Sequence, residues 1–144
     1  MTLEHILTWL QLPISAIDDR RAQFRVDESV TVQLELTADG EYLRIRAVVG
    51  HSLETGPSAL AFDIAVANYA GAATGSGALG LNPANGEVLL FLEMPCELMN
   101  ASTTETVLGR FVEAALYWQS RFENPTQASE TADSGATPQD WVRA

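Results

Sequence analysis

Apolar residues recur every three or four positions in three stretches of the chain, and every second position in most of the sequence between them. The first spacing is typical of a helix that buries one face, and the second of a strand that buries one side. The spacing of three or four predicts helices over Thr2 to Leu12, from Pro57 or Ser58 to about Ala70, and from Ser102 to about Phe122. Three strands before the central helix and two after it complete an α+β fold in the order α-β-β-β-α-β-β-α.

Capping signals mark the ends of the outer helices. Thr2 is placed to cap the first helix, and Pro13 is expected to end it because a proline disfavours helical geometry at the preceding Leu12. Ser102 and Glu105 have the Ser-x-x-Glu spacing of a capping box, so the last helix is predicted to begin there.

The Asp39-Gly40 pair predicts a hairpin, because both residues tolerate a positive φ. Counting outward from this turn places apolar residues opposite one another: Leu36 with Leu43, Leu34 with Ile45, and Val32 with Ala47. On the other face the same count places Glu35 opposite Arg44 and Gln33 opposite Arg46, a favourable arrangement of charge in an antiparallel sheet.

The central helix has two apolar faces on nearly opposite sides. Leu60, Ile64 and Ala67 share one face, and Phe62, Val66 and Tyr69 share the other. A surface helix needs only one apolar face. The second face indicates contact with a second subunit; the alternative is a helix buried within one domain, which is harder to arrange in a chain with three helices.

Gly75-Ser76-Gly77-Ala78-Leu79-Gly80 matches the pattern GxGxxG of dinucleotide sites. That fingerprint must leave a strand and open a helix, whereas here the glycines leave a helix and enter a strand, so no cofactor is expected. The glycines instead suit a tight helix exit and a close approach of backbones. The strand that follows is apolar on both sides, with Val88, Leu90 and Leu92 on one and Leu89 and Phe91 on the other.

Charge and reactive residues exclude several functions. The net charge is -11 and the chain has no lysine, so nucleic acid and anionic membranes should be repelled. Cys96 is the only cysteine, and His5 and His51 have no accompanying nucleophile or metal-ligand spacing, so neither an enzyme nor a metal site is expected. The sequence shows no secretory signal and no apolar run long enough for a membrane span, which favours a soluble, intracellular protein.

The segments Ala67-Asn68-Tyr69, Thr74 to Asn82 and Asn85 to Leu90, in this order of elements, resemble the signature stretch of the Tir chaperone (CesT) family, the class I type III secretion chaperones of bacteria. The resemblance covers about residues 1–122. It implies a cytoplasmic homodimer with a twisted antiparallel sheet. Such chaperones use no ATP; they hold the N-terminal chaperone-binding segment of secreted effector proteins in extended form and keep it secretion-competent.

The resemblance also implies two surfaces. Family members dimerise mainly through the second helix and the strand after it, which here gives the candidates Leu60, Phe62, Ile64, Val66, Ala67, Tyr69, Leu79 and Leu81. They bind effectors through apolar patches on the first helix and the sheet, which here gives the candidates Leu3, Leu7, Leu10, Val32, Leu34, Leu89 and Phe91. An extended segment gains main-chain hydrogen bonds at a sheet edge and affinity from side-chain pockets.

Residues 123–144 are polar in composition and are predicted to be a flexible acidic tail. Trp141-Val142 near its end is either part of a flexible terminus or a short docking element for the chain's own groove, for an export ATPase or for another partner. Two alternatives to the secretion chaperone stay open: a YbjN-like module that binds proteins outside type III secretion, and a small enzyme.

Overall fold

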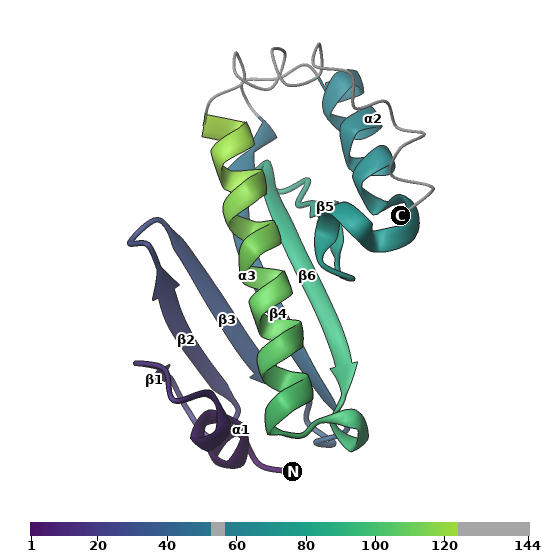
Figure 1. Ribbon diagram of the computed structural model, residues 1–144. Coiled ribbons are helices and arrows are strands. Elements are labelled where there is room, and N and C mark those ends of the chain that lie inside the picture. Colours follow the sequence, from purple (N-terminus) through teal and green to yellow (C-terminus); the bar gives the residue numbers. More distant parts are fainter. Residues whose placement is uncertain (53–56, 124–144) are drawn as a thin grey trace.

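A computed structural model describes residues 1–52 and 57–123 of the chain, and in it six strands form one antiparallel sheet flanked by three α-helices (Figure 1). The helices are α1 (Leu3–Leu10), α2 (Pro57–Asn68) and α3 (Ala101–Glu123), with 3-10 segments η2 (Tyr69–Thr74) and η3 (Cys96–Leu98). The strands are β1 (Ser15–Ala16), β2 (Arg21–Val26), β3 (Val30–Leu36), β4 (Tyr42–His51), β5 (Ala78–Leu81) and β6 (Glu87–Pro95). The predicted α+β class and order of helices and strands are confirmed, with β1 as one short additional strand.

The strands lie in the order β1-β2-β3-β4-β6-β5. α3 runs along the middle of one face of the sheet, with α1 beside its N-terminal end, and α2 stands apart beside the β5 edge (Figure 1). The core lies between the sheet and α1 and α3, and its fully buried members include Ile6, Leu34, Leu43, Ile45, Leu90 and Phe111. The opposite face of the sheet carries no helix in the described part of the chain, and we call it the open face.

The predicted hairpin register is confirmed at every pair, from Leu36 opposite Leu43 to Val32 opposite Ala47. Alternation therefore buries one side of each strand, as a half-covered antiparallel sheet requires. The ion pairs differ from the expected arrangement. Glu35 binds the diagonal Arg46 at 2.7 Å, and Arg44 turns to Glu93 of β6, also at 2.7 Å. Diagonal neighbours lie within reach of a long arginine side chain, so the pairing is not limited to residues directly opposite.

The ends of the outer helices agree with the sequence in part. Thr2 caps α1 as predicted, accepting a hydrogen bond from the His5 backbone N–H. The helix ends at Leu10, two residues before the predicted end, because Gln11 adopts a left-handed conformation. The predicted capping box at Ser102 and Glu105 is wrong: α3 begins at Ala101, and Asn100 and Thr103 form the reciprocal bonds instead, each 3.0 Å long.

The glycine-rich link after α2 is held against two other backbones. Gly75 has a left-handed φ of 59°, and a Cβ placed there would lie 2.6 Å from the Arg110 carbonyl oxygen of α3. A Cβ at Gly77 would lie 2.6 Å from the Phe91 carbonyl oxygen of β6. Real Cβ contacts do not come so close, so the expectation that these glycines permit a close backbone approach is confirmed.

Three polar contacts fix η2 in this position. The Trp118 indole N–H of α3 donates to the Ala73 carbonyl at 2.8 Å. The Thr74 hydroxyl, fully buried, donates to the Gly77 carbonyl at 2.6 Å. The Asn68 side chain, at the end of α2, bonds to the backbone of Leu79 in β5. Buried polar groups with satisfied bonds specify one arrangement, so these contacts define where α2 stands relative to the sheet.

We predict that Gly77→Ala destabilises the protein by about 1–3 kcal/mol, because the added methyl group forces apart the link and β6. Gly80→Ala is the matched control, since its Cβ would meet nothing closer than 4.0 Å, and its free energy of unfolding should change by less than about 0.5 kcal/mol. Urea denaturation of both variants measures the difference. Equal stabilities would show that the link is not tightly packed.

Candidate functional site

The candidate residues for effector binding divide between the core and the surface. Leu3, Val32 and Leu34 are at most 2% exposed, and Leu7 and Leu10 are half-buried. A single chain therefore offers no surface at the first three, because α1, α3 and the sheet pack over them. Leu89 and Phe91 lie on the open face, where Phe91 is 50% exposed. Of the seven candidates, only these two belong to an accessible patch of the sheet.

The candidate residues for dimerisation divide in the same way. The face of α2 formed by Leu60, Ile64 and Ala67 turns inward: Leu60 and Ala67 are buried, and Ile64 packs against the core. Leu79 of β5 is buried as well. The other face remains outside, with Phe62 68% and Tyr69 63% exposed and Val66 half-buried; Leu81 is also exposed. We call the surface formed by Phe62 and Val66 of α2 and by Tyr69, the first residue of η2, the outer face of α2.

The open face combines apolar side chains with ion pairs. Val48, Leu89 and Phe91 form its apolar part, and Val48 lies opposite Leu89 in the register of β4 and β6. A shallow groove of about 550 Å³ runs beside them and is lined by Arg44, Arg46, Gly80, Leu89, Phe91 and Glu93. Hydrogen bonding to Glu93 raises the pKa of Arg44. The two ion pairs are half-exposed and contribute little stability, so their role is to set the charge pattern of the surface.

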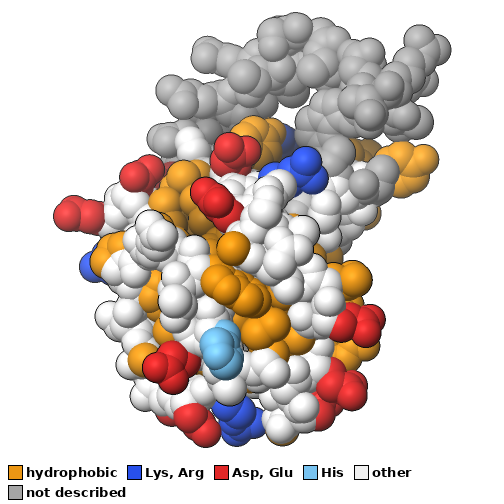
Figure 2. Space-filling view, turned by 60° about the horizontal axis from the view of Figure 1, so that its bottom comes forward, with side chains coloured by type: hydrophobic (Ala, Val, Ile, Leu, Met, Phe, Trp, Pro, Cys, Tyr) orange, Lys and Arg blue, Asp and Glu red, His pale blue; other side chains and the backbone are white. Residues whose placement is uncertain are grey.

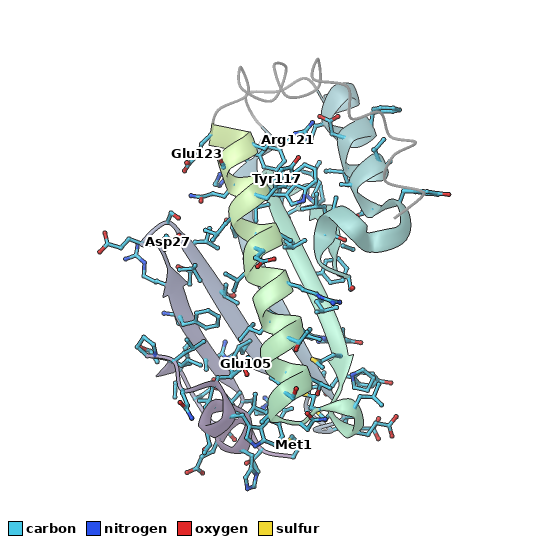
Figure 3. All side chains as sticks on the ribbon, viewed as in Figure 1. Met1, Asp27, Glu105, Tyr117, Arg121 and Glu123 are labelled. Carbon is cyan, nitrogen blue, oxygen red and sulfur yellow. The ribbon has the colours of Figure 1, made fainter. Side chains whose placement is uncertain are left out.

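Some exposed residues near these surfaces were not among the sequence-based candidates for effector binding or dimerisation. Val48 is exposed on the open face, and continuing the hairpin register by one residue past Ala47 would have found it. Tyr117 of α3 lies outside the predicted apolar stripe, accepts a hydrogen bond from Arg121 and is exposed near the C-terminal end of the helix (Figure 3). No sequence signal indicated that Asn68 would reach β5, because its partner is a backbone group eleven residues away.

The reactive residues do not form a catalytic arrangement within the described ranges. Cys96 is buried in η3, and burial raises the pKa of its thiol. His5 lies near the start of α1, where its Nδ1 is 2.8 Å from the Thr2 hydroxyl, and His51 ends β4. Among residues 1–52 and 57–123, no three His, Cys, Asp or Glu side chains are grouped as metal ligands. No helix in these ranges has the length and apolar character to cross a membrane.

Acidic side chains dominate the charge of the surface. Figure 2, which brings the α1 end of the molecule forward, shows them spread around the outline, with hydrophobic side chains gathered in the middle. The domain thus combines an acidic surface with two separate apolar surfaces, the open face and the outer face of α2.

Comparison with known proteins defines the family. Residues 2–119 match the model of the Tir chaperone protein (CesT) family, so the chain belongs to that family. A comparison with curated protein sequences gave no match.

Solved structures with the same fold include chains from three protein complexes. The chain in the crystal structure of the ExsC-ExsE complex is 23% identical, with a TM-score of 0.67 over 85% of this chain and 97% of that one. A chain of the HopA1-SchA chaperone-effector complex is 15% identical, with a TM-score of 0.62 over 82% and 90%. A chain of the ExoU-SpcU complex from the type III secretion system of Pseudomonas aeruginosa is 16% identical, with a TM-score of 0.59 over 80% and 92%. These similarities confirm the fold.

We predict that Cys96 reacts slowly with thiol reagents in the native protein. Its thiol is buried and its raised pKa leaves less of the reactive thiolate at pH 8, so labelling should be more than about tenfold slower than in the urea-unfolded chain. Because the chain has one cysteine, the labelling signal is unambiguous. Equal rates in the two states would contradict the buried position.

Proposed function

We propose that this protein is a type III secretion chaperone that binds the N-terminal chaperone-binding segment of effector proteins in extended form, without ATP, and keeps it secretion-competent. The observation that carries the proposal is the family match over residues 2–119. The complexes of similar fold support it, because the HopA1-SchA structure is described as a chaperone bound to its effector. Residues 1–122 form the chaperone domain in this proposal, and the remaining residues form the acidic tail.

The open face supports binding of an extended segment. Leu89, Phe91 and Val48 provide apolar contacts, and the groove beside them is bordered by the Arg44–Glu93 ion pair. Apolar side chains of a client would pack on the first group, while polar side chains or main-chain groups would meet the arginine and glutamate at the border. A surface of this composition recognises an apolar segment without requiring one fixed sequence.

The outer face of α2 supports a homodimer. Phe62 of α2 and Tyr69 at the start of η2 are large aromatic residues, and both are more than 60% exposed, whereas the other face of α2 is already packed. Aromatic residues of this kind are typical of interface centres, and an isologous dimer would bring the same face of two copies together. The dimer would join two open faces into one molecule on which a single effector segment can be held.

The location and other partners follow from the same role. The protein would act in the bacterial cytoplasm, where effectors await export, and the secretion export ATPase is a further proposed partner. No enzymatic activity is part of the role. The net charge of -11 keeps a protein with exposed apolar surfaces soluble and attracts basic clients.

We predict that Phe62→Asp converts the dimer to a monomer, because an isologous interface would bury this carboxylate twice, once from each copy. Light scattering at micromolar concentration measures the mass. Leu98→Asp is the matched control: Leu98 is 62% exposed in η3, at the opposite end of the molecule from α2, and this change should leave the dimer intact (Figure 1). A monomeric wild-type protein, or a dimer unaffected by Phe62→Asp, would contradict the proposed interface.

We predict that Phe91→Asp weakens effector binding by about tenfold or more while the chain remains folded, because it places a charge in the apolar part of the open face. The test is co-expression with tagged effectors from the same genome, followed by a pull-down and by a binding titration with the effector's N-terminal segment. Leu98→Asp again serves as control. If the wild-type protein retains no effector, the proposed function fails; if Phe91→Asp binds normally, the open face is not the binding surface.

A further inference from the structure

The sheet has an edge at β5, and only two residues of that strand direct their backbone groups away from the sheet. The Asn82 N–H bonds to the Glu87 carbonyl at 2.8 Å, and in an antiparallel pair the bonded residues alternate. Ala78 and Gly80 therefore face β6, whereas Leu79 and Leu81 direct their N–H and C=O groups outward. These outward groups are where another strand would pair.

The Asn68 side chain occupies one of these two positions completely. Its Oδ1 accepts from the Leu79 N–H at 2.7 Å, and its Nδ2 donates to the Leu79 carbonyl at 3.0 Å. A carboxamide has the same kinds of donor and acceptor as a peptide group, so the side chain makes the two hydrogen bonds that the backbone of a neighbouring strand would make to Leu79. Leu79 is buried and the contact is partly buried, which makes the two bonds costly to break.

We propose that Asn68 closes the β5 edge, so that no strand of another molecule can pair with it there. With Leu79 occupied, Leu81 alone remains, and one outward pair of groups cannot fix the register of an added strand. Asn68 is thus a positioning residue that keeps the β5 edge from pairing with another strand.

The outer face of α2 continues from the closed edge. Asn68 is the last residue of α2, and Tyr69 follows it directly. α2 stands beside β5 (Figure 1), and the Asn68 side chain extends from the last residue of this helix to the strand. The side chains left for a partner are then Phe62, Val66 and Tyr69, which can pack without any main-chain pairing.

The test is the mass of Asn68→Ala, measured by light scattering over a range of concentrations, together with amide hydrogen exchange. The variant opens the Leu79 position, so two free edges per dimer can pair with other dimers. We expect species larger than the dimer at high concentration. At low concentration the Leu79 amide should exchange roughly five- to tenfold faster than in the wild-type protein.

A second substitution separates edge closure from simple anchoring of α2. Leu81→Pro removes the outward N–H at the other edge position without removing a bond to β6, and proline is tolerated at edge strands for this reason. Asn68→Ala with Leu81→Pro should lose the larger species and have the same mass as Leu81→Pro alone. Leu81→Pro alone is the reference, because Leu81 is itself a candidate dimer residue. A residue that merely anchored the helix would give no such rescue.

The outcomes are distinguishable from those of the proposed function. If folded Asn68→Ala keeps the wild-type mass at every concentration, or if Leu81→Pro fails to reverse its larger species, edge closure is wrong. If the wild-type protein is a monomer, the homodimer fails, yet edge closure still predicts that Asn68→Ala associates. If Asn68→Ala does not fold, Asn68→Asp replaces it, because the carboxylate still accepts the bond from the Leu79 N–H and leaves only the Leu79 carbonyl free. Species of Asn68→Asp larger than the wild-type protein would then support the proposal. An unchanged mass would refute it.

Discussion

The close approach of the glycine-rich link to two other backbones is the constraint on which the arrangement of this protein depends. Gly75 lies against the α3 backbone and Gly77 against that of β6, at distances that leave no room for a Cβ. η2 is thereby seated between the last helix and the sheet, and the Trp118 indole bonds to it. Because η2 connects α2 to β5, its position decides that α2 stands beside the edge of the sheet rather than across one of its faces.

That position determines which apolar residues are left for partners. α2 and β6 are each apolar on two sides, and a chain of this size buries only one side of each. α3 and α1 cover the inner side of the sheet, so Phe91 remains on the open face, and β5 covers the inner side of α2, so Phe62 and Tyr69 remain outside. Two separate surfaces result, one on the sheet and one on a helix, and in the proposed chaperone dimer the first would bind the client and the second would bind the other copy of the chain.

The sequence predicted the fold well where one local rule decides the outcome. Alternation and the turn at Asp39-Gly40 fixed the hairpin register, and the period of α2 separated its two faces correctly. The sequence did not predict the burial of single residues or the partners of polar side chains, because these depend on contacts between distant elements. The burial of Val32 depends on where α3 lies, and the choice of Arg44 between Glu35 and Glu93 depends on which strand becomes its neighbour. The hydrogen bonds from Asn68 to the β5 backbone depend on the position of η2, and the spacing of apolar residues along the chain does not predict that position.

The most direct test of the central claim is the mass of the complex that forms when this chain is co-expressed with an effector from the same genome. Native mass spectrometry of the purified material should find two copies of the chain with one effector polypeptide, because the outer face of α2 is proposed to join the copies and their open faces to hold the client. A chain that purifies as a monomer with no bound polypeptide, in the presence of every effector of that genome, would contradict the account.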